Sequence, residues 1–446
     1  MCHNCAMKKN SEREVAVAAL REILESRAYS NLALRRILAE NGHLGRVQRA
    51  FVTEIVAGCV RNLFYIDHII ANFSKTPLKK IKPQILNILR ISVYQMKFMD
   101  KVPIFAICDE AVKMAKSQAF GGLSGFVNSL LRNIARNETP APKDLSIRYS
   151  TQNWIVRHFI DELGESGAKS LLTSIMQPPA ITLCVNTLKV TTSDLAGILA
   201  AEGVEVAPAT VANALKIAKT ADISTLDSFK QGLYHIMDEA AMLAVQIAAP
   251  PENARIIDLC AAPGGKTFAA AYLAGVGAKI VANDIHPHKI KLLEDGVARL
   301  GLKNVEARLA DAKIHRPELA NWADLLIVDA PCSGLGTLRR RPDLKLFKEP
   351  ESPETLALLA REFIKNSWQY VKIGGRILFC TCTISKIENI DNFNWIKANL
   401  PFKPVDFFDK IPQPLDYPTA KFGHIQILPQ NFDTDGFFIS LLERVE

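Results

Sequence analysis

Three short segments carry the residues that could do chemistry in this chain. The first is Asp258-Leu-Cys-Ala-Ala-Pro-Gly-Gly-Lys-Thr267, and two later ones contain cysteine, Asp329-Ala-Pro-Cys-Ser-Gly334 and Cys380-Thr-Cys-Thr383. A Gly-Gly-Lys-Thr turn that follows a predicted strand is typical of a loop that holds a nucleotide-type cofactor. A thiolate is an effective covalent nucleophile. A cofactor loop facing two thiols therefore predicts covalent catalysis on a bound substrate.

The cofactor loop has two readings. Residues 260–267 nearly match the phosphate loop G-x-x-x-x-G-K-[ST] of nucleotide triphosphatases, but Cys260 replaces the first glycine and Pro263 removes a backbone N–H. Four acids follow predicted strands whose carboxyl ends meet at one edge of a parallel sheet. They are Asp258, Asp284, Asp311 and Asp329. Such a cluster repels a triphosphate and suits a cationic sulfonium nucleoside, so we expect S-adenosylmethionine.

Each part of this cofactor has an expected contact. Asp284 is expected to hold the ribose and Asp311 the adenine edge, while Gly264 and Gly265 let the methionine end approach the backbone. The full expected cofactor-binding set is Cys260, Ala261, Ala262, Pro263, Gly264, Gly265, Lys266, Asp284, Asp311 and Asp329.

A methyl donor beside two thiols restricts the kinds of atom that could accept the methyl group. Carbon-5 of cytosine is a poor nucleophile until a thiolate adds to carbon-6, and a second basic group must then remove the carbon-5 proton. Cys332, Cys382, Asp329 and Lys266 are the catalytic candidates: Asp329 would bond the base edge, and Lys266 would position the base or lower a thiol pKa. Spacing alone does not say which cysteine attacks, and Cys380 shares a strand face with Cys382.

These residues need a sheet to position them. Strands are predicted at 255–259, 279–283, 304–309, 324–329 and 376–382, alternating with helices, and two further strands are predicted at 425–428 and 437–442. This pattern indicates a mostly parallel, doubly wound α/β sheet. Before it, residues 11–136 show helical spacing throughout, and residues 180–237 read as a small α+β insert. The expected domains are 1–140, 141–238 and 239–446.

Charge is unevenly distributed along the 446 residues. Residues 1–150 hold 23 Lys and Arg against 12 Asp and Glu, a net charge of +11, and the remainder has a net charge of −3. A basic helical module attached to a near-neutral enzyme-like module suggests a polyanionic partner such as nucleic acid. The run Arg339-Arg-Arg341 close to Cys332 is expected to contact phosphates.

Several classes are disfavoured by composition. No apolar run approaches the length of a membrane span, and the N-terminus lacks the apolar core of a secretory signal. Nine cysteines are too few for a disulfide framework, and Cys2 and Cys5 lack a second ligand pair for zinc. Cys59, Cys108 and Cys184 are expected to be small buried side chains. A cytoplasmic protein without metal is predicted.

Together the motifs resemble the RsmB/Sun family of RNA 5-methylcytosine methyltransferases. The matching segments are Cys260–Lys266, Asn283-Asp284, Asp311-Ala312, Asp329–Gly334, Thr381-Cys382 and Glu388-Asn389, and residues 1–136 resemble the NusB RNA-binding fold through Arg49–Glu54 and Gly125–Arg132. The resemblance implies that Cys382 is the nucleophile and that Cys332 removes the carbon-5 proton. Cys184 and Met237 depart from the arginine and glutamine that the family often has there.

The resulting expectation is a Rossmann-like methyltransferase domain preceded by an all-helical NusB-like bundle and a small α+β insert. It would use S-adenosylmethionine to methylate carbon-5 of one cytosine in 16S ribosomal RNA, naked or partly assembled into the small subunit, and would act as a monomer. The alternatives are the same chemistry on another RNA such as tRNA, a nucleotide triphosphatase, or a non-catalytic NusB-like RNA-binding factor.

Overall fold

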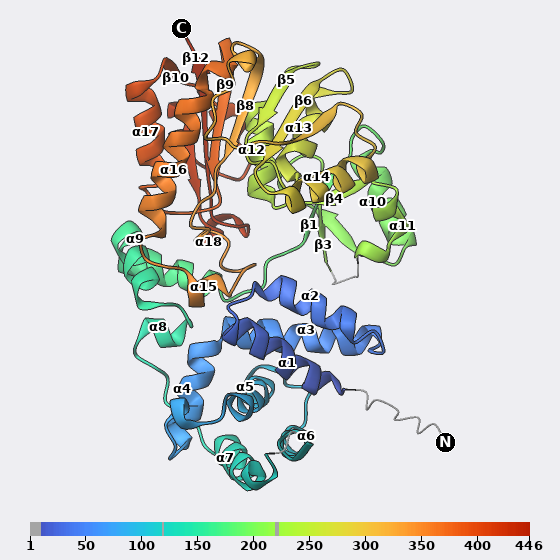
Figure 1. The fold of residues 1–446 in the computed structure, drawn as a ribbon, viewed down its shortest axis with the longest axis vertical. Coiled ribbons are helices and arrows are strands. Elements are labelled where there is room, and N and C mark those ends of the chain that lie inside the picture. Colours follow the sequence, from blue (N-terminus) through green and yellow to red (C-terminus); the bar gives the residue numbers. More distant parts are fainter. Residues whose placement is uncertain (1–9, 118–119, 219–222) are drawn as a thin grey trace. The chain divides into compact units, whose positions relative to one another are not determined.

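A computed structural model describes residues 10–117, 120–218 and 223–446, so Cys2 and Cys5 lie outside the described residues. The chain forms two compact units (Figure 1). Of the described residues, the helical unit comprises those up to Met176 together with Arg341–Lys348, and the second unit comprises those within Gln177–Arg340 and Glu349–Glu446. The expected domain boundaries at residues 140 and 238 stay predictions.

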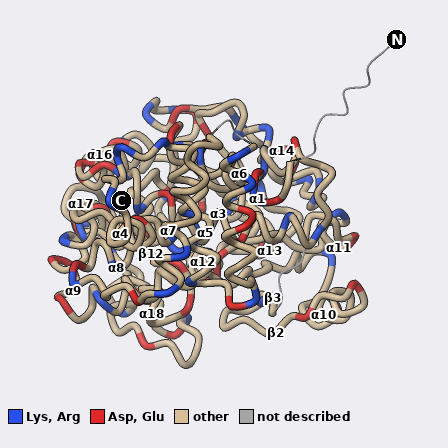
Figure 2. Tube along the Cα trace, turned by 90° about the horizontal axis from the view of Figure 1, so that it is seen from below, with Lys and Arg blue, Asp and Glu red and all other residues tan. Residues whose placement is uncertain are grey.

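The helical unit contains the helices that the sequence predicts. They are α1 (Glu12–Glu25), α2 (Ser30–Glu40), α3 (Arg46–Arg61), α4 (Leu63–Phe73), α5 (Pro83–Phe98), α6 (Ile104–Ser117), α7 (Ser124–Arg136), α8 (Leu145–Arg148) and α9 (Asn153–Ser174). Helix α1 begins with the predicted capping box, in which Ser11 and Glu14 each accept a backbone N–H from the other. The apolar faces of α1, α3 and α5 pack into one core. Figure 2 marks the charged residues along the trace.

A segment from later in the sequence completes this unit. Arg341–Lys348 contains the short helix α15 (Leu344–Phe347), and Leu346 and Phe347 pack against the helical core. The Lys345 side chain is fully buried, and its Nζ donates to Arg61 O at 2.8 Å and Tyr149 O at 3.1 Å. Burial, together with the charge of Arg61, lowers the pKa of Lys345 to about 7.

The second unit begins with a small antiparallel sheet of order β2-β3-β1-β4. Its strands are β1 (Thr182–Val185), β2 (Val206–Pro208), β3 (Ala214–Ile217) and β4 (Tyr234–Ile236), with helices α10 (Thr192–Ala201) and α11 (Asp227–Lys230). This is the predicted α+β insert, with β2 as an additional short strand. His235 on β4 is buried and contacts Gly265 O through Nε2 at 3.2 Å, so the insert packs directly against the cofactor loop.

The larger sheet has the order β10-β12-β9-β8-β5-β6-β7, and β11 pairs with β12. Its strands are β5 (Arg255–Asp258), β6 (Lys279–Asp284), β7 (Val305–Leu309), β8 (Ala323–Asp329), β9 (Val371–Thr381), β10 (Phe402–Pro404), β11 (His424–Ile427) and β12 (Phe437–Arg444). Strands β7, β6, β5, β8 and β9 run parallel, whereas β12 runs antiparallel between β9 and β10. The predicted doubly wound sheet is confirmed, and the two further predicted strands appear as β11 and β12, which pair antiparallel with each other.

Helices cover both faces of this sheet. On one face lie α12 (Glu239–Ala248), α13 (Gly265–Ala274) and α14 (Pro287–Leu300), and on the other α16 (Ser352–Ser367) and α17 (Ile390–Asn399). Neighbouring residues such as Leu325 and Leu326 enter the two opposite cores, because successive side chains of a strand point to opposite faces. The buried strands therefore read as continuous Val, Ile and Leu runs rather than as an alternating pattern.

Strand order determines where ligands can bind. β5 and β8 are adjacent, and the chain departs from them in opposite directions across the sheet. Such a switch point leaves a crevice beyond the carboxyl ends of the strands. Asp258 and Asp329 end these two strands, and Asp284 ends β6.

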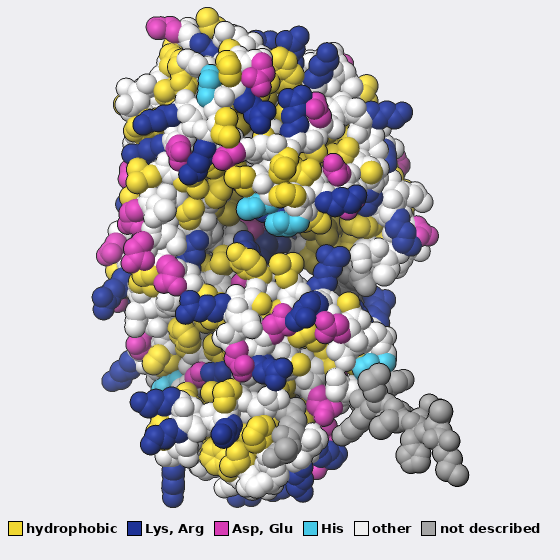
Figure 3. All heavy atoms as spheres, in the orientation of Figure 1, with side chains coloured by type: hydrophobic (Ala, Val, Ile, Leu, Met, Phe, Trp, Pro, Cys, Tyr) yellow, Lys and Arg dark blue, Asp and Glu magenta, His cyan; other side chains and the backbone are white. Residues whose placement is uncertain are grey.

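Among the described residues, no helix is both long and apolar enough to cross a membrane. On the face drawn in Figure 3, hydrophobic side chains are intermixed with acidic and basic ones.

Replacement of Lys345 by methionine should remove a pH dependence of stability. The folded protein holds the pKa of Lys345 at about 7, below its ordinary 10.5, so between these values the unfolded chain binds the extra proton. The free energy of unfolding should therefore rise with pH over this range in the wild type, and rise less steeply in Lys345→Met. Urea denaturation of the helical signal between pH 7 and 10 measures this slope.

The matched control is Lys97→Met, which removes an exposed lysine of the same unit and should leave the slope unchanged. Parallel pH profiles for the wild type and Lys345→Met would contradict a lowered pKa at Lys345.

Candidate active site

The loop between β5 and α13 is tightly folded at the carboxyl edge of the sheet. Ala261 N donates to Asn283 O at 2.8 Å, and Gly264 N donates to Ala261 O at 2.7 Å. Gly264 caps α13 with φ of +113°, and a Cβ on it would lie 2.2 Å from the Phe268 ring. Only glycine fits this position, where the chain turns sharply and keeps backbone N–H groups at the helix start facing the crevice.

Asp258 supplies a buried acceptor beneath this loop. Its Oδ2 accepts from the Thr267 hydroxyl at 2.7 Å, whereas its buried Oδ1 has no hydrogen-bond partner. Burial raises the pKa of Asp258 to about 7. A buried carboxylate oxygen without a partner fits a site where a ligand completes the bonding.

Asp284 and Asp311 lie along the same edge. Asp284 is buried at the end of β6, and its Oδ1 accepts from His286 N at 3.0 Å. Asp311 follows β7, and its Oδ1 accepts from Lys313 N at 2.8 Å. A pocket here is lined by Leu259, Asn283, Ala310, Asp311, Ala312, Ile314, Arg316, Leu319 and Tyr370. Its lining combines apolar side chains with the polar groups of Asn283, Asp311, Arg316 and Tyr370.

Lys266 and Asp329 join the cofactor loop to the end of β8. Lys266 Nζ lies 2.6 Å from Asp329 Oδ2, and the same Nζ lies 5.0 Å from the centroid of the Phe437 ring. Burial by itself would lower the pKa of Lys266, but the charge of Asp329 and the nearby cysteines outweighs it and raises the pKa above its ordinary value. Lys266 is therefore a fixed cation paired with Asp329.

Cys332 and Cys382 come together from two separate segments. Their sulfur atoms are 3.2 Å apart, Cys332 lying in the loop after β8 and Cys382 just past the end of β9. Hydrogen bonding to Cys382 and burial raise the pKa of the Cys332 thiol well above its ordinary value. A thiol of this kind holds its proton, and its thiolate is a strong base.

Buried polar contacts hold the two cysteine loops. Glu388 accepts from Ser333 N at 2.7 Å and from the Ser333 hydroxyl at 2.5 Å, and that hydroxyl also bonds Thr383 at 2.7 Å. Asn389 donates to Thr383 O at 3.0 Å. The residues that follow each cysteine are thus tied to one buried glutamate, which fixes the backbone on which both thiols are carried.

Most residues expected at the site are brought together at this edge. Cys260 is partly buried in the loop after β5, and burial raises its thiol pKa. Cys380 is fully buried in the core, where burial also raises its thiol pKa, although its Sγ is 4.0 Å from Asp329 Oδ1. Cys59, Cys108 and Cys184 are buried, as predicted. Within the described residues, no group of three His, Cys, Asp or Glu could hold a metal ion.

The expectation that the arginine run contacts phosphates is wrong for Arg339 and Arg340. Arg339 is 3% exposed and pairs with Asp433, while Arg340 pairs with Asp238 and Asp435. Their guanidinium groups already have carboxylate partners inside the protein.

Sequence reasoning missed the roles of Ser333, Thr383 and Phe437 around the thiols. Ser333 and Thr383 directly follow the two candidate cysteines, so their positions were a usable signal. Phe437 comes from a distant strand, and no local pattern connects it with Lys266.

Three segments of the chain match known protein families. Residues 10–136 match the NusB family, residues 152–224 match the ferredoxin-like domain of the RsmF/B-like methyltransferases, and residues 245–443 match the family described as 16S rRNA methyltransferase RsmB/F. A Bacillus subtilis protein named probable ribosomal RNA small subunit methyltransferase B is 34% identical, covering 98% of this chain and 100% of its own.

Two solved structures support the fold. The crystal structure of PH0851 is 27% identical with a TM-score of 0.81, and the match covers 98% of this chain and 100% of that one. NSun6 from Pyrococcus horikoshii, solved with SFG, is 20% identical with a TM-score of 0.58 over 66% of this chain and 98% of its own. With 34% identity to the Bacillus protein over nearly the whole length, the chain belongs to the RsmB/F family of 16S rRNA methyltransferases.

Proposed function

We propose that the protein transfers a methyl group from S-adenosylmethionine to carbon-5 of a cytosine in 16S ribosomal RNA, through a covalent bond between Cys382 and carbon-6. The observation that carries the proposal is the pair of thiols 3.2 Å apart beside the Asp329–Lys266 ion pair. One thiol is needed to attack carbon-6 and a second to take the carbon-5 proton, and the site offers both.

The side chains divide the steps of this reaction. The Cys382 thiolate would add to carbon-6 and make carbon-5 nucleophilic. S-adenosylmethionine, when bound, would supply the methyl group to carbon-5 by breaking its sulfur–methyl bond, and S-adenosylhomocysteine would leave. Once the Cys382 sulfur is bonded to carbon-6, the contact that contributes most to raising the pKa of Cys332 is gone, and the Cys332 thiol would release its proton to solvent. The resulting thiolate would take the carbon-5 proton, and the Cys382–carbon-6 bond would break. Asp329, held by Lys266 through Oδ2, would accept a hydrogen bond from the exocyclic amine through Oδ1.

The site residues also support S-adenosylmethionine over a magnesium nucleotide. A phosphate loop needs a free lysine for the β- and γ-phosphates and a free hydroxyl for magnesium. Here Lys266 is bound to Asp329, and the buried Thr267 hydroxyl donates to Asp258. SFG, which accompanies NSun6 in its crystal structure, is an analogue of S-adenosylmethionine.

The RNA would be held partly by the basic helical unit. NusB-type domains are associated with RNA, and residues 1–150 carry a net charge of +11. The target cytosine must be unpaired or flipped from its stack, because Cys382 cannot reach carbon-6 inside a duplex. A cytoplasmic monomer acting on naked or partly assembled small-subunit RNA fits these features.

Replacing Asp284 by alanine should weaken binding of S-adenosylmethionine by about 10- to 100-fold, the usual effect of losing hydrogen bonds to a charged group. Asp295→Ala is the matched control, because Asp295 is an exposed acid of the same domain that pairs with Lys291. Calorimetric titration with S-adenosylmethionine and with Mg-ATP measures both. Tight Mg-ATP binding without S-adenosylmethionine binding would contradict the proposal.

Replacing Cys332 by alanine should trap the RNA on the protein. The Cys382 bond still forms, but the group that removes the carbon-5 proton is missing, so release is blocked. A protein–RNA adduct should survive on denaturing gels for Cys332→Ala and be absent for Cys382→Ala.

Cys184→Ala is the control, since this buried cysteine lies outside the site and should turn over without a stable adduct. An adduct in Cys382→Ala and none in Cys332→Ala would reverse the two roles. Full activity of Cys382→Ala would favour a non-catalytic RNA-binding factor.

Loss of the gene should remove a single 5-methylcytosine from 16S ribosomal RNA. Bisulfite sequencing of 16S RNA and tRNA from the deletion strain, with and without a plasmid copy, identifies the nucleotide. Unchanged 16S RNA together with a lost tRNA signal would reassign the substrate.

A further inference from the structure

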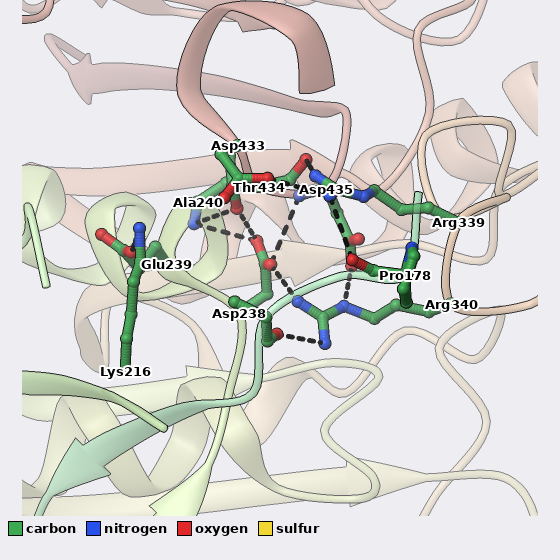
Figure 4. Close-up of polar contacts among 11 residues, drawn as sticks. Pro178, Lys216, Asp238, Glu239, Ala240, Arg339, Arg340, Asp433, Thr434 and Asp435 are labelled. Carbon is green, nitrogen blue, oxygen red and sulfur yellow. Dashed lines mark hydrogen bonds and ion pairs between the residues drawn. The ribbon is translucent and has the colours of Figure 1, made fainter. Parts of the chain in front are cut away.

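An arginine–carboxylate cluster lies in the second unit between three chain segments (Figure 4). Arg340 Nη2 is 2.6 Å from Asp238 Oδ2, and Arg340 Nε is 2.7 Å from Asp435 Oδ2. The third guanidinium nitrogen, Nη1, donates to Ala180 O at 3.2 Å. All three nitrogens of Arg340 are therefore engaged with the protein itself.

Each partner of Arg340 belongs to a different element. Asp238 caps the start of α12, where its Oδ1 accepts from Ala240 N and from the Thr434 hydroxyl. Asp435 lies in the turn that leads into β12. Arg340 follows the loop that carries Cys332, so one guanidinium joins the catalytic loop to both other segments (Figure 4).

The neighbouring Arg339 holds the same turn from a second side. Its Nη2 is 2.9 Å from Asp433 Oδ1, and its Nη1 donates to Thr434 O at 3.4 Å. The Asp435 side chain is 7% exposed, and burial together with the charge of Asp238 raises the pKa of Asp435 to about 7 despite the opposing effect of Arg340. Without Arg340, the buried carboxylates of Asp238 and Asp435 would face each other uncompensated.

A continuous set of backbone contacts leads from this cluster to Cys382. Gly436, next to Asp435, donates its N–H to Gly336 O at 2.8 Å, and Gly336 N donates to Cys382 O at 3.0 Å. A Cβ on Gly336 would lie 1.9 Å from Gly436 O and 2.8 Å from Cys382 O. The three backbones touch with no room for a side chain, so a shift of the Asp435 turn is passed directly to Cys382.

We propose that Arg340 is a positioning residue for the methyl transfer: by clamping Asp435 and Asp238 against the Cys332 loop, it sets the backbone of Cys382 and hence the contact between the two sulfur atoms. The predicted effect of Arg340 on catalysis rests on the proposed function. Its predicted effect on the distance between the two sulfur atoms does not. Arg340 touches neither thiol, and its effect passes through Gly436 and Gly336.

The experiment compares Arg340→Gln, Arg340→Lys and Asp435→Asn with the unaltered chain. Arg376→Gln is the matched control, because Arg376, in the middle of β9, pairs with Glu443 and takes no part in the cluster around Arg340. The first measurement is the rate at which iodoacetamide labels Cys332 and Cys382, read by peptide mass spectrometry. Thermal melting and S-adenosylmethionine binding are measured on every variant.

Loosening the clamp should make Cys332 more reactive. Contact with Cys382 and burial raise the Cys332 pKa, so separation of the sulfurs should increase its labelling about tenfold for each unit that the pKa falls. Arg340→Lys keeps the charge but can reach one carboxylate at a time, and should fall between the wild type and Arg340→Gln. Binding of S-adenosylmethionine should change little, since Asp284 and Asp311 lie outside the cluster.

The second measurement uses the Cys332→Ala background, where the rate of adduct formation with saturating RNA reports the attack by Cys382. Misplacement of the nucleophile by about 1 Å costs on the order of 100-fold, so Arg340→Gln should slow adduct formation by about that factor. Failure of the Cys332→Ala parent to form any adduct would count against the proposed function, and the labelling result would still decide the role of Arg340.

The inference would be overturned if Cys332 were labelled at the same rate in folded Arg340→Gln and Asp435→Asn as in the unaltered chain. Equal losses of folding, S-adenosylmethionine binding and adduct rate in all three variants would also overturn it, because they would assign the cluster a general structural role.

Discussion

The ion pair between Lys266 and Asp329 is the contact on which the arrangement of the site depends. Adjacent parallel strands bring the buried Asp258 and the partly exposed Asp329 to the same edge, where the charge of Asp329 adds to burial in raising the pKa of Asp258. Lys266, at the first turn of α13, supplies the compensating charge at 2.6 Å from Asp329. One lysine thereby ties the cofactor loop to the strand that leads to Cys332, and its ammonium group also contacts the ring of Phe437.

Around that pair, the site is built from loops rather than from the strands themselves. Cys332 and Cys382 each lie just beyond a strand, and their backbones are held by Glu388 on one side and by the contact of Gly336 with Gly436 on the other. The strand ends determine at which edge of the sheet the two thiols lie. The distance between the two sulfur atoms is set by side chains from more distant parts of the sequence. The precision that covalent chemistry needs is therefore distributed over buried polar contacts around the thiols.

The strands of the large sheet could be predicted from the sequence because buried parallel strands appear in it as apolar runs. Every strand predicted for this sheet is present and overlaps its predicted range. The short strands β2 and β10 were missed, since three residues with a proline carry little strand signal. The arginine run was misread because Asp238 and Asp435, its partners, are far away in sequence. Spacing along the strand also left Cys380 and Cys382 as equivalent candidates. The fold separates them, because Cys380 is buried whereas Cys382, like Cys332, is partly exposed.

The placement of Arg341–Lys348 in the helical unit has a consequence for synthesis of the protein. The N-terminal helices leave the ribosome first, and domains usually fold in that order. Here the site that receives Lys345, formed by Arg61 and Tyr149, stays unfilled until residue 348 has emerged, when β5 to β8 of the second unit have already been made. The helical unit thus starts folding first but is completed only after half of the methyltransferase sheet has been synthesised. Completion of the first unit therefore depends on synthesis of part of the second.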